Sequence, residues 1–153
     1  MSFFQVFLLQ GVLLWVISAP LLAAAPAQLT PLDYLAALAW GLGFFFEALG
    51  DGQMARFKAD PANRGKVMSA SLWHYTRHPN YFGDAVQWWA YFLLAAAAGG
   101  YWTVFSPLLM TFLLLRVSGV SLLEKSLKET RPGYKEYSET TSAFIPWWPK
   151  KLI

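Results

Sequence analysis

Polar side chains that could bind a ligand are concentrated in one short stretch of an otherwise apolar sequence. Residues 72–84, LWHYTRHPNYFGD, carry a guanidinium, two imidazoles, an amide, two phenols and a carboxylate. A long apolar run follows at once, and such a run favours a membrane-spanning helix. We therefore expect these groups to lie where a membrane meets water, and we interpret the stretch as a site for a polar ligand.

Three of these residues, Arg77, His78 and Asn80, are predicted to surround the N-terminus of the helix that begins near residue 82. Asn is a good N-cap, and free backbone amides beside cations form an anion site. The phosphates of a soluble nucleotide would suit this site, with Lys58 and Arg64 adding charge. Anionic lipid head groups are the alternative ligand. Because the sequence has no glycine-rich phosphate loop, side chains of a helical bundle would have to hold a nucleotide.

A metal site is not expected. His74 and His78 have the i,i+4 spacing of a helical metal pair, but Pro79 disfavours a helical conformation at His78. The sequence contains no HExxH pattern and no cysteine, which excludes zinc–thiolate sites, disulfides and thiol nucleophiles.

Two more groups of charged residues could contribute to a site. Glu47 and Asp51 are four residues apart and share a helix face, where they could accept hydrogen bonds from ribose hydroxyls or an amide, or act as acid and base. An exposed helix end is the alternative. Arg116 lies inside an apolar run, two turns before Glu124 and on the same predicted face. It would contact a ligand, extend towards the head groups, or pair with Asp84 or Glu47.

Two tyrosines in the C-terminal region, Tyr134 and Tyr137, are three residues apart and share a predicted helix face. They could flank a flat ring, or they could fix the tail at the membrane interface, as aromatic residues often do. The sequence leaves both possibilities open.

The composition indicates which elements position these residues. Of the 153 residues, 56% are hydrophobic and 14% are charged, against roughly 25% charged in soluble domains. We predict an all-α, polytopic membrane bundle that forms a single domain, residues 1–153. It would have about four transmembrane helices, at about residues 3–25, 34–49, 82–99 and 104–123. Residues 51–81 would form a cytoplasmic loop, and residues 124–153 a helical cytoplasmic tail. A signal peptide is the alternative for the first helix.

The distribution of basic residues predicts the orientation. Turns 26–31 and 99–103 contain no Lys or Arg, whereas loop 51–81 and the tail contain eleven of the twelve. Because positive residues stay on the cytoplasmic side, both termini are expected to be cytoplasmic. The same topology explains the net charge of +3, so nucleic acid is not an expected partner.

Four patches together resemble the steroid 5-alpha-reductase-like family, and more closely its bacterial branch of multi-span membrane proteins. The first is the stretch 72–84, and the second is Glu47-x-x-x-Asp51-x-Gln53 followed by Phe57-Lys58. The others are residues 115–125, LRVSGVSLLEK, and the tail from Arg131-Pro132-Gly133-Tyr134 to Ile145-Pro146-Trp147. The match covers about residues 40–150.

This resemblance implies a reductase of a bacterial inner membrane that uses NADPH from the cytoplasmic side. Its substrate would be the activated carbon–carbon double bond of a steroid or similar lipid, reduced by hydride delivery while a protein acid protonates the carbonyl oxygen. The cofactor would carry the difficult step, and the protein would orient it. The predicted cofactor-binding residues are Glu47, Asp51, Lys58, Tyr75, Arg77, His78, Asn80, Tyr81, Asp84, Arg116, Glu124, Tyr134 and Tyr137.

The sequence departs from the family in two ways. Ser71 stands where the family usually has glycine before the Leu-Trp pair. Related proteins also have several more spans upstream, including the Glu and Tyr that polarise the substrate carbonyl, so a second chain or a homo-oligomer could supply them.

Two other functions are alternatives to a reductase. A membrane methyltransferase would use S-adenosylmethionine, although its late acidic pair is here Glu124-Lys125. A non-catalytic or truncated membrane subunit is the other.

Overall fold

The computed structural model describes residues 3–23, 28–117 and 120–150. These described residues form helices, turns and loops, and they contain no β-strand, so the predicted all-α class is confirmed. In chain order the elements are α1 (Phe3–Ile17), α2 (Ala19–Ala23), α3 (Pro31–Ala59), η1 (Pro61–Asn63), α4 (Leu72–Tyr75), α5 (Pro79–Ala97), η2 (Tyr101–Val104), α6 (Phe105–Phe112), the π-helical segment η3 (Leu113–Val117), α7 (Val120–Thr130) and α8 (Tyr134–Thr140).

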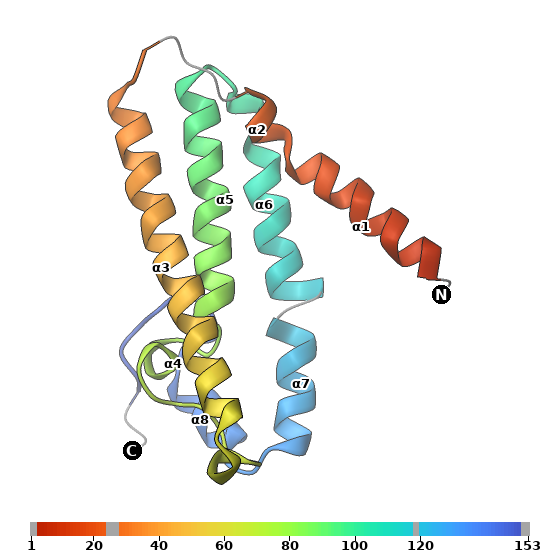
Figure 1. Cartoon of the computed structure of the whole chain (residues 1–153), viewed down its shortest axis with the longest axis vertical. Coiled ribbons are helices and arrows are strands. Elements are labelled where there is room, and N and C mark those ends of the chain that lie inside the picture. Colours follow the sequence, from red (N-terminus) through yellow and green to blue (C-terminus); the bar gives the residue numbers. More distant parts are fainter. Residues whose placement is uncertain (1–2, 24–27, 118–119, 151–153) are drawn as a thin grey trace.

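The bundle is essentially one layer of helices in which α5 lies between α3 and α6 (Figure 1). The helix α7 continues below α6, and α8 with α4 closes the lower end, while α1 projects away from the layer (Figure 1). The first predicted span is interrupted at Ser18, between α1 and α2. Pro20 follows in the first turn of α2, a position where proline is tolerated because no intrahelical donor is lost.

The helix α3 is longer than the sequence indicated. It begins after Thr30, whose backbone N–H donates to Asp33 Oδ2 at 2.7 Å, and Pro31 occupies the first helical position. It ends at Asp60, because the residue before a proline avoids helical geometry. The predicted span ended at residue 49, where the apolar residues end, but the helix continues to Ala59. Part of the predicted loop 51–81 is therefore helical.

The helix α5 packs against α3 without intervening side chains at one point. A Cβ atom on Gly83 would lie 2.4 Å from the carbonyl oxygen of Gly43 and 2.5 Å from the backbone nitrogen of Glu47. This contact requires glycine and fixes the two helices at short range. The helix begins with Pro79 and ends at Ala97, close to the predicted range 82–99.

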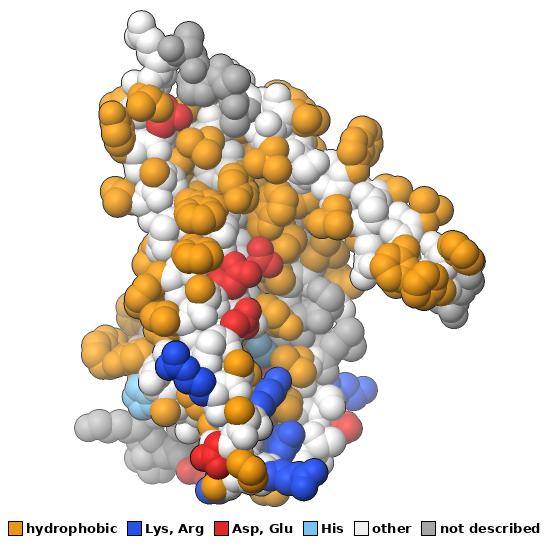
Figure 2. All heavy atoms as spheres, viewed as in Figure 1, with side chains coloured by type: hydrophobic (Ala, Val, Ile, Leu, Met, Phe, Trp, Pro, Cys, Tyr) orange, Lys and Arg blue, Asp and Glu red, His pale blue; other side chains and the backbone are white. Residues whose placement is uncertain are grey.

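Among the described residues, two helical segments are long and apolar enough to cross a membrane, Phe3–Ala23 and Pro31–Ala59. The apolar segment Tyr101–Val117 is shorter, and the predicted span 104–123 is divided among α6, η3 and α7, with residues 118–119 outside the described part. Figure 2 shows hydrophobic side chains over the upper part of the molecule and Lys and Arg gathered at its lower end. The fold is thus that of a helical membrane protein with a basic end.

Candidate functional site

A cavity of about 680 Å³ lies at the basic end, below the contact between α3 and α5. Its walls come from the last turns of α3, the loop 60–68, the segment 73–81, α7 and α8. The charged residues that line it are five cations and two acids, namely Lys58, Arg64, Lys66, Arg77, Arg131, Asp51 and Asp60. Such a set favours an anionic ligand.

The loop after α3 turns back over the end of its own helix and thereby forms one wall. Asp60 Oδ1 accepts a hydrogen bond from the N–H of Ala62 at 2.9 Å and caps η1. The side-chain amide of Asn63 donates to Phe57 O at 3.1 Å. The chain then turns at Gly65, whose φ of 83° suits glycine. This arrangement places the cations on either side of the turn at the cavity.

Arg77 forms a buried hub in the opposite wall, with only 8% of the residue exposed. Its Nε and Nη2 atoms donate to the two oxygens of Glu124 at 2.8 and 2.9 Å, which is a bidentate pair. Its Nη1 atom donates to the carbonyl oxygen of Ser138 at 2.7 Å and also to that of Thr141. A single guanidinium thus joins the start of α5, α7 and the end of α8.

Glu124 is held from two sides. His78 Nε2 lies 3.2 Å from Glu124 Oε1, and the His78 ring stacks on Tyr81 with the ring centres 5.4 Å apart. Burial alone would raise the pKa of Glu124, but the hydrogen bonds from His78 and Arg77 and the charge of Arg77 outweigh it and lower the pKa to about 2. The carboxylate is therefore ionised and stabilises the wall.

The stretch 72–84 is fixed to the C-terminal tail by hydrogen bonds to backbone carbonyl oxygens. Thr76 Oγ1 donates to the carbonyl oxygen of Phe144 at 2.8 Å, and the N–H of Trp147 donates to Tyr75 O at 2.9 Å. Ser71, before α4, is the one described non-glycine residue with positive φ, at 56°. The departure from glycine noted in the sequence therefore falls at a position whose backbone favours glycine.

Two buried tyrosines of α8 face the same region. The hydroxyl of Tyr137 donates to the carbonyl oxygen of Trp73. The hydroxyl of Tyr134 has no hydrogen-bond partner among the described residues. Burial, with the negative charge of Glu124, raises the pKa of Tyr134 to about 12, and burial also raises that of Tyr137. Both hydroxyls therefore stay protonated near neutral pH.

Eight of the thirteen predicted residues line the cavity: Asp51, Lys58, Arg77, His78, Asn80, Tyr81, Tyr134 and Tyr137. Two of them are directly joined, because the Asn80 side-chain amide donates to Asp51 Oδ1 at 2.9 Å. Whether these residues bind a cofactor stays a prediction.

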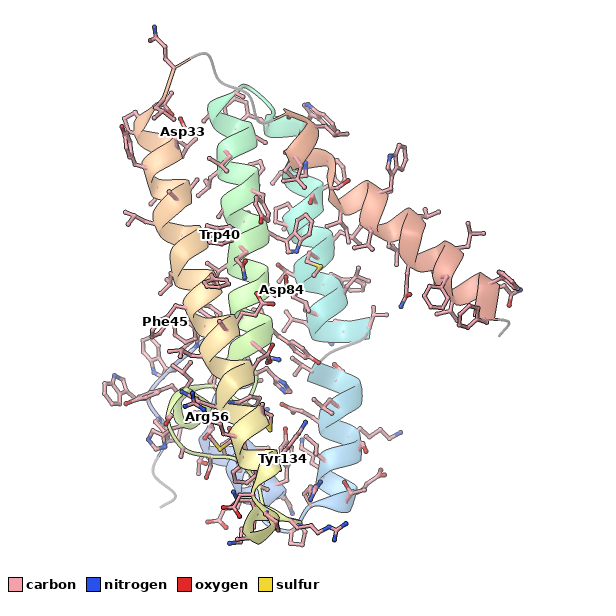
Figure 3. The ribbon with its side chains drawn as sticks, viewed as in Figure 1. Asp33, Trp40, Phe45, Arg56, Asp84 and Tyr134 are labelled. Carbon is pink, nitrogen blue, oxygen red and sulfur yellow. The ribbon has the colours of Figure 1, made fainter. Side chains whose placement is uncertain are left out.

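The other five lie outside the cavity wall. Glu124 is behind it, bonded to Arg77. Glu47 accepts a hydrogen bond from Gln87, and Asp84, near Glu47, lies higher along α5 (Figure 3). The ring of Tyr75 lies against Trp148 and His74, with centroids 5.2 and 5.1 Å away.

Arg116 is exposed and lies in η3. The sequence placed Arg116 and Glu124 on one face of a regular helix, but Arg116 lies in η3, which is π-helical, and Glu124 lies in α7. Residues 118–119 between these elements are outside the described part. The two residues therefore differ in environment, one exposed and the other buried.

Two cations at the cavity, Lys66 and Arg131, were not predicted, whereas Arg64 was expected to add charge beside Lys58. The signal of the two was present in the sequence, because Lys66 follows Gly65 in the turn after Asp60–Pro61 and Arg131 precedes a Pro-Gly pair. Turns of this kind bring distant charges together, but the sequence does not show which charges meet.

Apolar helices of membrane-spanning length and a cationic cavity at one end are the features of a helical membrane protein. The chain belongs to the family described as "Protein of unknown function (DUF1295)", whose family model matches residues 1–141.

Two curated proteins are similar to part of the chain. An uncharacterised protein of Schizosaccharomyces pombe is 30% identical over 95 residues, covering 60% of this chain and 27% of that protein. A Delta(14)-sterol reductase of Gibberella zeae is 30% identical over 92 residues, covering 51% of this chain and 19% of the reductase. The matches thus span about a quarter or less of the relatives' length. No solved structure matched the chain.

Proposed function

We propose that the chain is a membrane-embedded, NADPH-dependent reductase-like protein that acts on the activated carbon–carbon double bond of a steroid-like or other lipid enone. The observation that carries the proposal is the cationic cavity at the membrane-distal end of α3 and α5. The similarity to a Delta(14)-sterol reductase supports the reaction class.

The charge of the cavity favours a phosphate-bearing cofactor. Glu124 neutralises Arg77, so four cations, Lys58, Arg64, Lys66 and Arg131, face two carboxylates, Asp51 and Asp60, and the balance is 4 − 2 = +2. NADPH carries several negative charges on its phosphates, which such a surface attracts. S-adenosylmethionine carries a positive sulfonium centre and no phosphate, so the same surface disfavours the methyltransferase alternative.

The residues of the chain would divide the binding among them. The cations at the lower end would hold phosphates, as Arg and Lys do in many proteins. Trp73 and Tyr81 would contact flat rings, and the Asp51–Asn80 pair would bond ribose hydroxyls. When bound, NADPH supplies a hydride. Glu47 and Asp84 lie above the cavity, towards the apolar part of the bundle, and would face a lipid substrate that arrives there.

The topology we propose has four spans, with α5 and the α6–η3 segment crossing the membrane besides Phe3–Ala23 and Pro31–Ala59. Both termini and the cavity would be on the cytoplasmic side of a bacterial inner membrane. The groups that polarise the substrate carbonyl in related enzymes have no counterpart in this chain. Since its matches span only 27% and 19% of the curated relatives, we propose that further spans from another chain or a second copy complete the site.

The test is thermal unfolding of the detergent-purified protein with NADPH, NADP⁺ and S-adenosylmethionine separately. A ligand at about a hundred times its dissociation constant stabilises by about 2.7 kcal/mol. We expect NADPH to raise the unfolding temperature, and Arg131→Glu to remove this effect. Lys128→Glu is the matched control, because Lys128 is an exposed cation of α7 outside the cavity.

The outcomes separate the candidate functions. Stabilisation by S-adenosylmethionine alone would favour a methyltransferase and contradict the proposal. Stabilisation by none of the three ligands would favour a non-catalytic subunit. An equal loss of the NADPH effect in both charge-reversal variants would mean that the cavity does not hold the phosphates.

A further inference from the structure

The hydroxyl group of Tyr134 is a buried polar atom for whose proton the described residues provide no acceptor. Only 4% of the residue is exposed, and the hydroxyl makes no hydrogen bond to any described residue. Proteins rarely leave such a group unpaired, because it loses its hydration without compensation. The group is therefore a candidate for contact with a ligand.

A neighbouring residue on the same helix shows what an ordinary buried tyrosine does here. The rings of Tyr134 and Tyr137 are 5.8 Å apart in an edge-to-face arrangement. The hydroxyl of Tyr137 donates to the carbonyl oxygen of Trp73 and is thus fully used within the chain. Both tyrosines line the cavity, but only the hydroxyl of Tyr134 is left free to meet what enters it.

No acceptor among the described residues makes a hydrogen bond with the Tyr134 hydroxyl. Arg77 interacts with Tyr134 and partly offsets the rise of its pKa, but it has only donors. The carboxylate of Glu124 is directed at Arg77 and His78 instead. Because burial and Glu124 raise the pKa of Tyr134 to about 12, the hydroxyl carries its proton at neutral pH. It therefore needs an acceptor from outside the chain.

The surroundings indicate the chemical class of that acceptor. Figure 3 places Tyr134 between the lower end of α3 and α7. The other charged groups on the cavity wall are mainly cations, from α3, from the loop after it and from the end of α7. An acceptor that suits both a hydroxyl donor and several cations is an anionic oxygen, and a phosphate group presents three or more of them.

We propose that the Tyr134 hydroxyl donates a hydrogen bond to a phosphate oxygen of the ligand in this cavity. This bond, rather than the packing of the ring, is the reason for tyrosine instead of phenylalanine at this position. The inference rests on the proposed function in so far as the phosphate belongs to NADPH. A lipid head group would offer the same acceptor, and the experiment below distinguishes the two sources.

The experiment compares three Tyr→Phe variants of the whole chain in nanodiscs. Tyr134→Phe is expected to weaken NADPH binding about tenfold to a hundredfold, as expected for loss of a hydrogen bond to a charged group. It should leave the unfolding temperature of the ligand-free protein unchanged or higher. Tyr137→Phe should lower that temperature, because its hydroxyl has a partner within the chain. Tyr101→Phe, on the exposed segment η2, should change neither quantity.

Each result has a distinct meaning. Equal affinity of the wild type and Tyr134→Phe for NADPH would overturn this inference and leave the proposed function standing. A lower unfolding temperature of ligand-free Tyr134→Phe would also overturn it, since the hydroxyl would then have an internal partner. If the wild type binds no NADPH and is not stabilised by phosphatidylglycerol, the inference fails with the proposed function. If phosphatidylglycerol nanodiscs stabilise the wild type but not Tyr134→Phe, relative to phosphatidylcholine, the bond is to a head group.

Discussion

Replacement of Glu124 by glutamine tests the arrangement of the cavity wall. The substitution keeps the size of the side chain but removes the charge that both Arg77 and His78 face. The guanidinium of Arg77 is then left buried, with its donors to Ser138 and Thr141 intact but its charge unpaired. We expect a large loss of stability and a looser attachment of α8.

Two estimates of the size of this loss agree. Removing one partner of a buried ion pair typically costs about 3–5 kcal/mol. The pKa of Glu124 falls from its ordinary value of 4.5 to about 2, and at about 1.4 kcal/mol per pKa unit this corresponds to about 3 kcal/mol of stability. Glu124→Gln should therefore reduce the free energy of unfolding by about 3 kcal/mol.

The assay is equilibrium unfolding in mixed micelles, titrated with sodium dodecyl sulfate and followed by circular dichroism. Glu129→Gln is the matched control, because Glu129 is an exposed acid on the same helix, and we expect it to change stability by less than about 0.5 kcal/mol. Tryptic cleavage after Lys135 should become faster in Glu124→Gln, since Arg77 no longer holds α8. If Glu124→Gln unfolds like Glu129→Gln, Arg77 is not the hub described above.

Three further predictions concern acid stability, helix packing and backbone strain. Because folding lowers the pKa of Glu124, its ionised carboxylate contributes fully to the free energy of unfolding above about pH 4.5, and this contribution is lost as the pH falls to about 2. A difference in unfolding free energy between the wild type and Glu124→Gln that stays constant over this pH range would contradict the prediction. Gly83→Ala should cost about 1–3 kcal/mol in the same assay, since its Cβ would meet the α3 backbone. Gly41→Ala, with nothing within 4 Å, should gain up to about 1 kcal/mol, and equal effects of the two would refute the close packing. Ser71→Gly should stabilise the folded protein by about 1 kcal/mol. The relief of about 1–3 kcal/mol of backbone strain at φ 56° outweighs the larger conformational entropy that glycine loses on folding. A destabilised variant would argue against that strain.

The sequence predicted the helical class and eight of the residues that line the cavity. Long apolar runs indicated α3 and α5 within a few residues, except where α3 continues to Ala59. A helix does not have to end where it becomes polar, so hydropathy alone placed that boundary too early. Glu47 and Asp51, which the sequence predicted to share a helix face, both lie in α3, but only Asp51 lines the cavity.

The sequence could not predict what depends on tertiary contacts. Arg77 was predicted to bind a phosphate, and nothing in the sequence indicated that its guanidinium also bonds Glu124 and carbonyls 61 and 64 residues further along the chain. No local pattern reports such a partner. Arg116 was placed with the cavity residues on the assumption of a regular helix, but it lies in the π-helical segment η3 and is exposed. Both differences arise because side-chain partners are set by packing rather than by spacing.

The most direct test of a phosphate-binding cavity is hydrogen–deuterium exchange of the protein in nanodiscs, with and without NADPH. The account predicts slower exchange in the presence of NADPH at the segments that form the cavity wall, residues 57–68, 77–81 and 131–137. Exposed η2 at the opposite end should be unchanged. Unchanged exchange at all three wall segments under saturating NADPH, or slower exchange only elsewhere, would contradict the central claim.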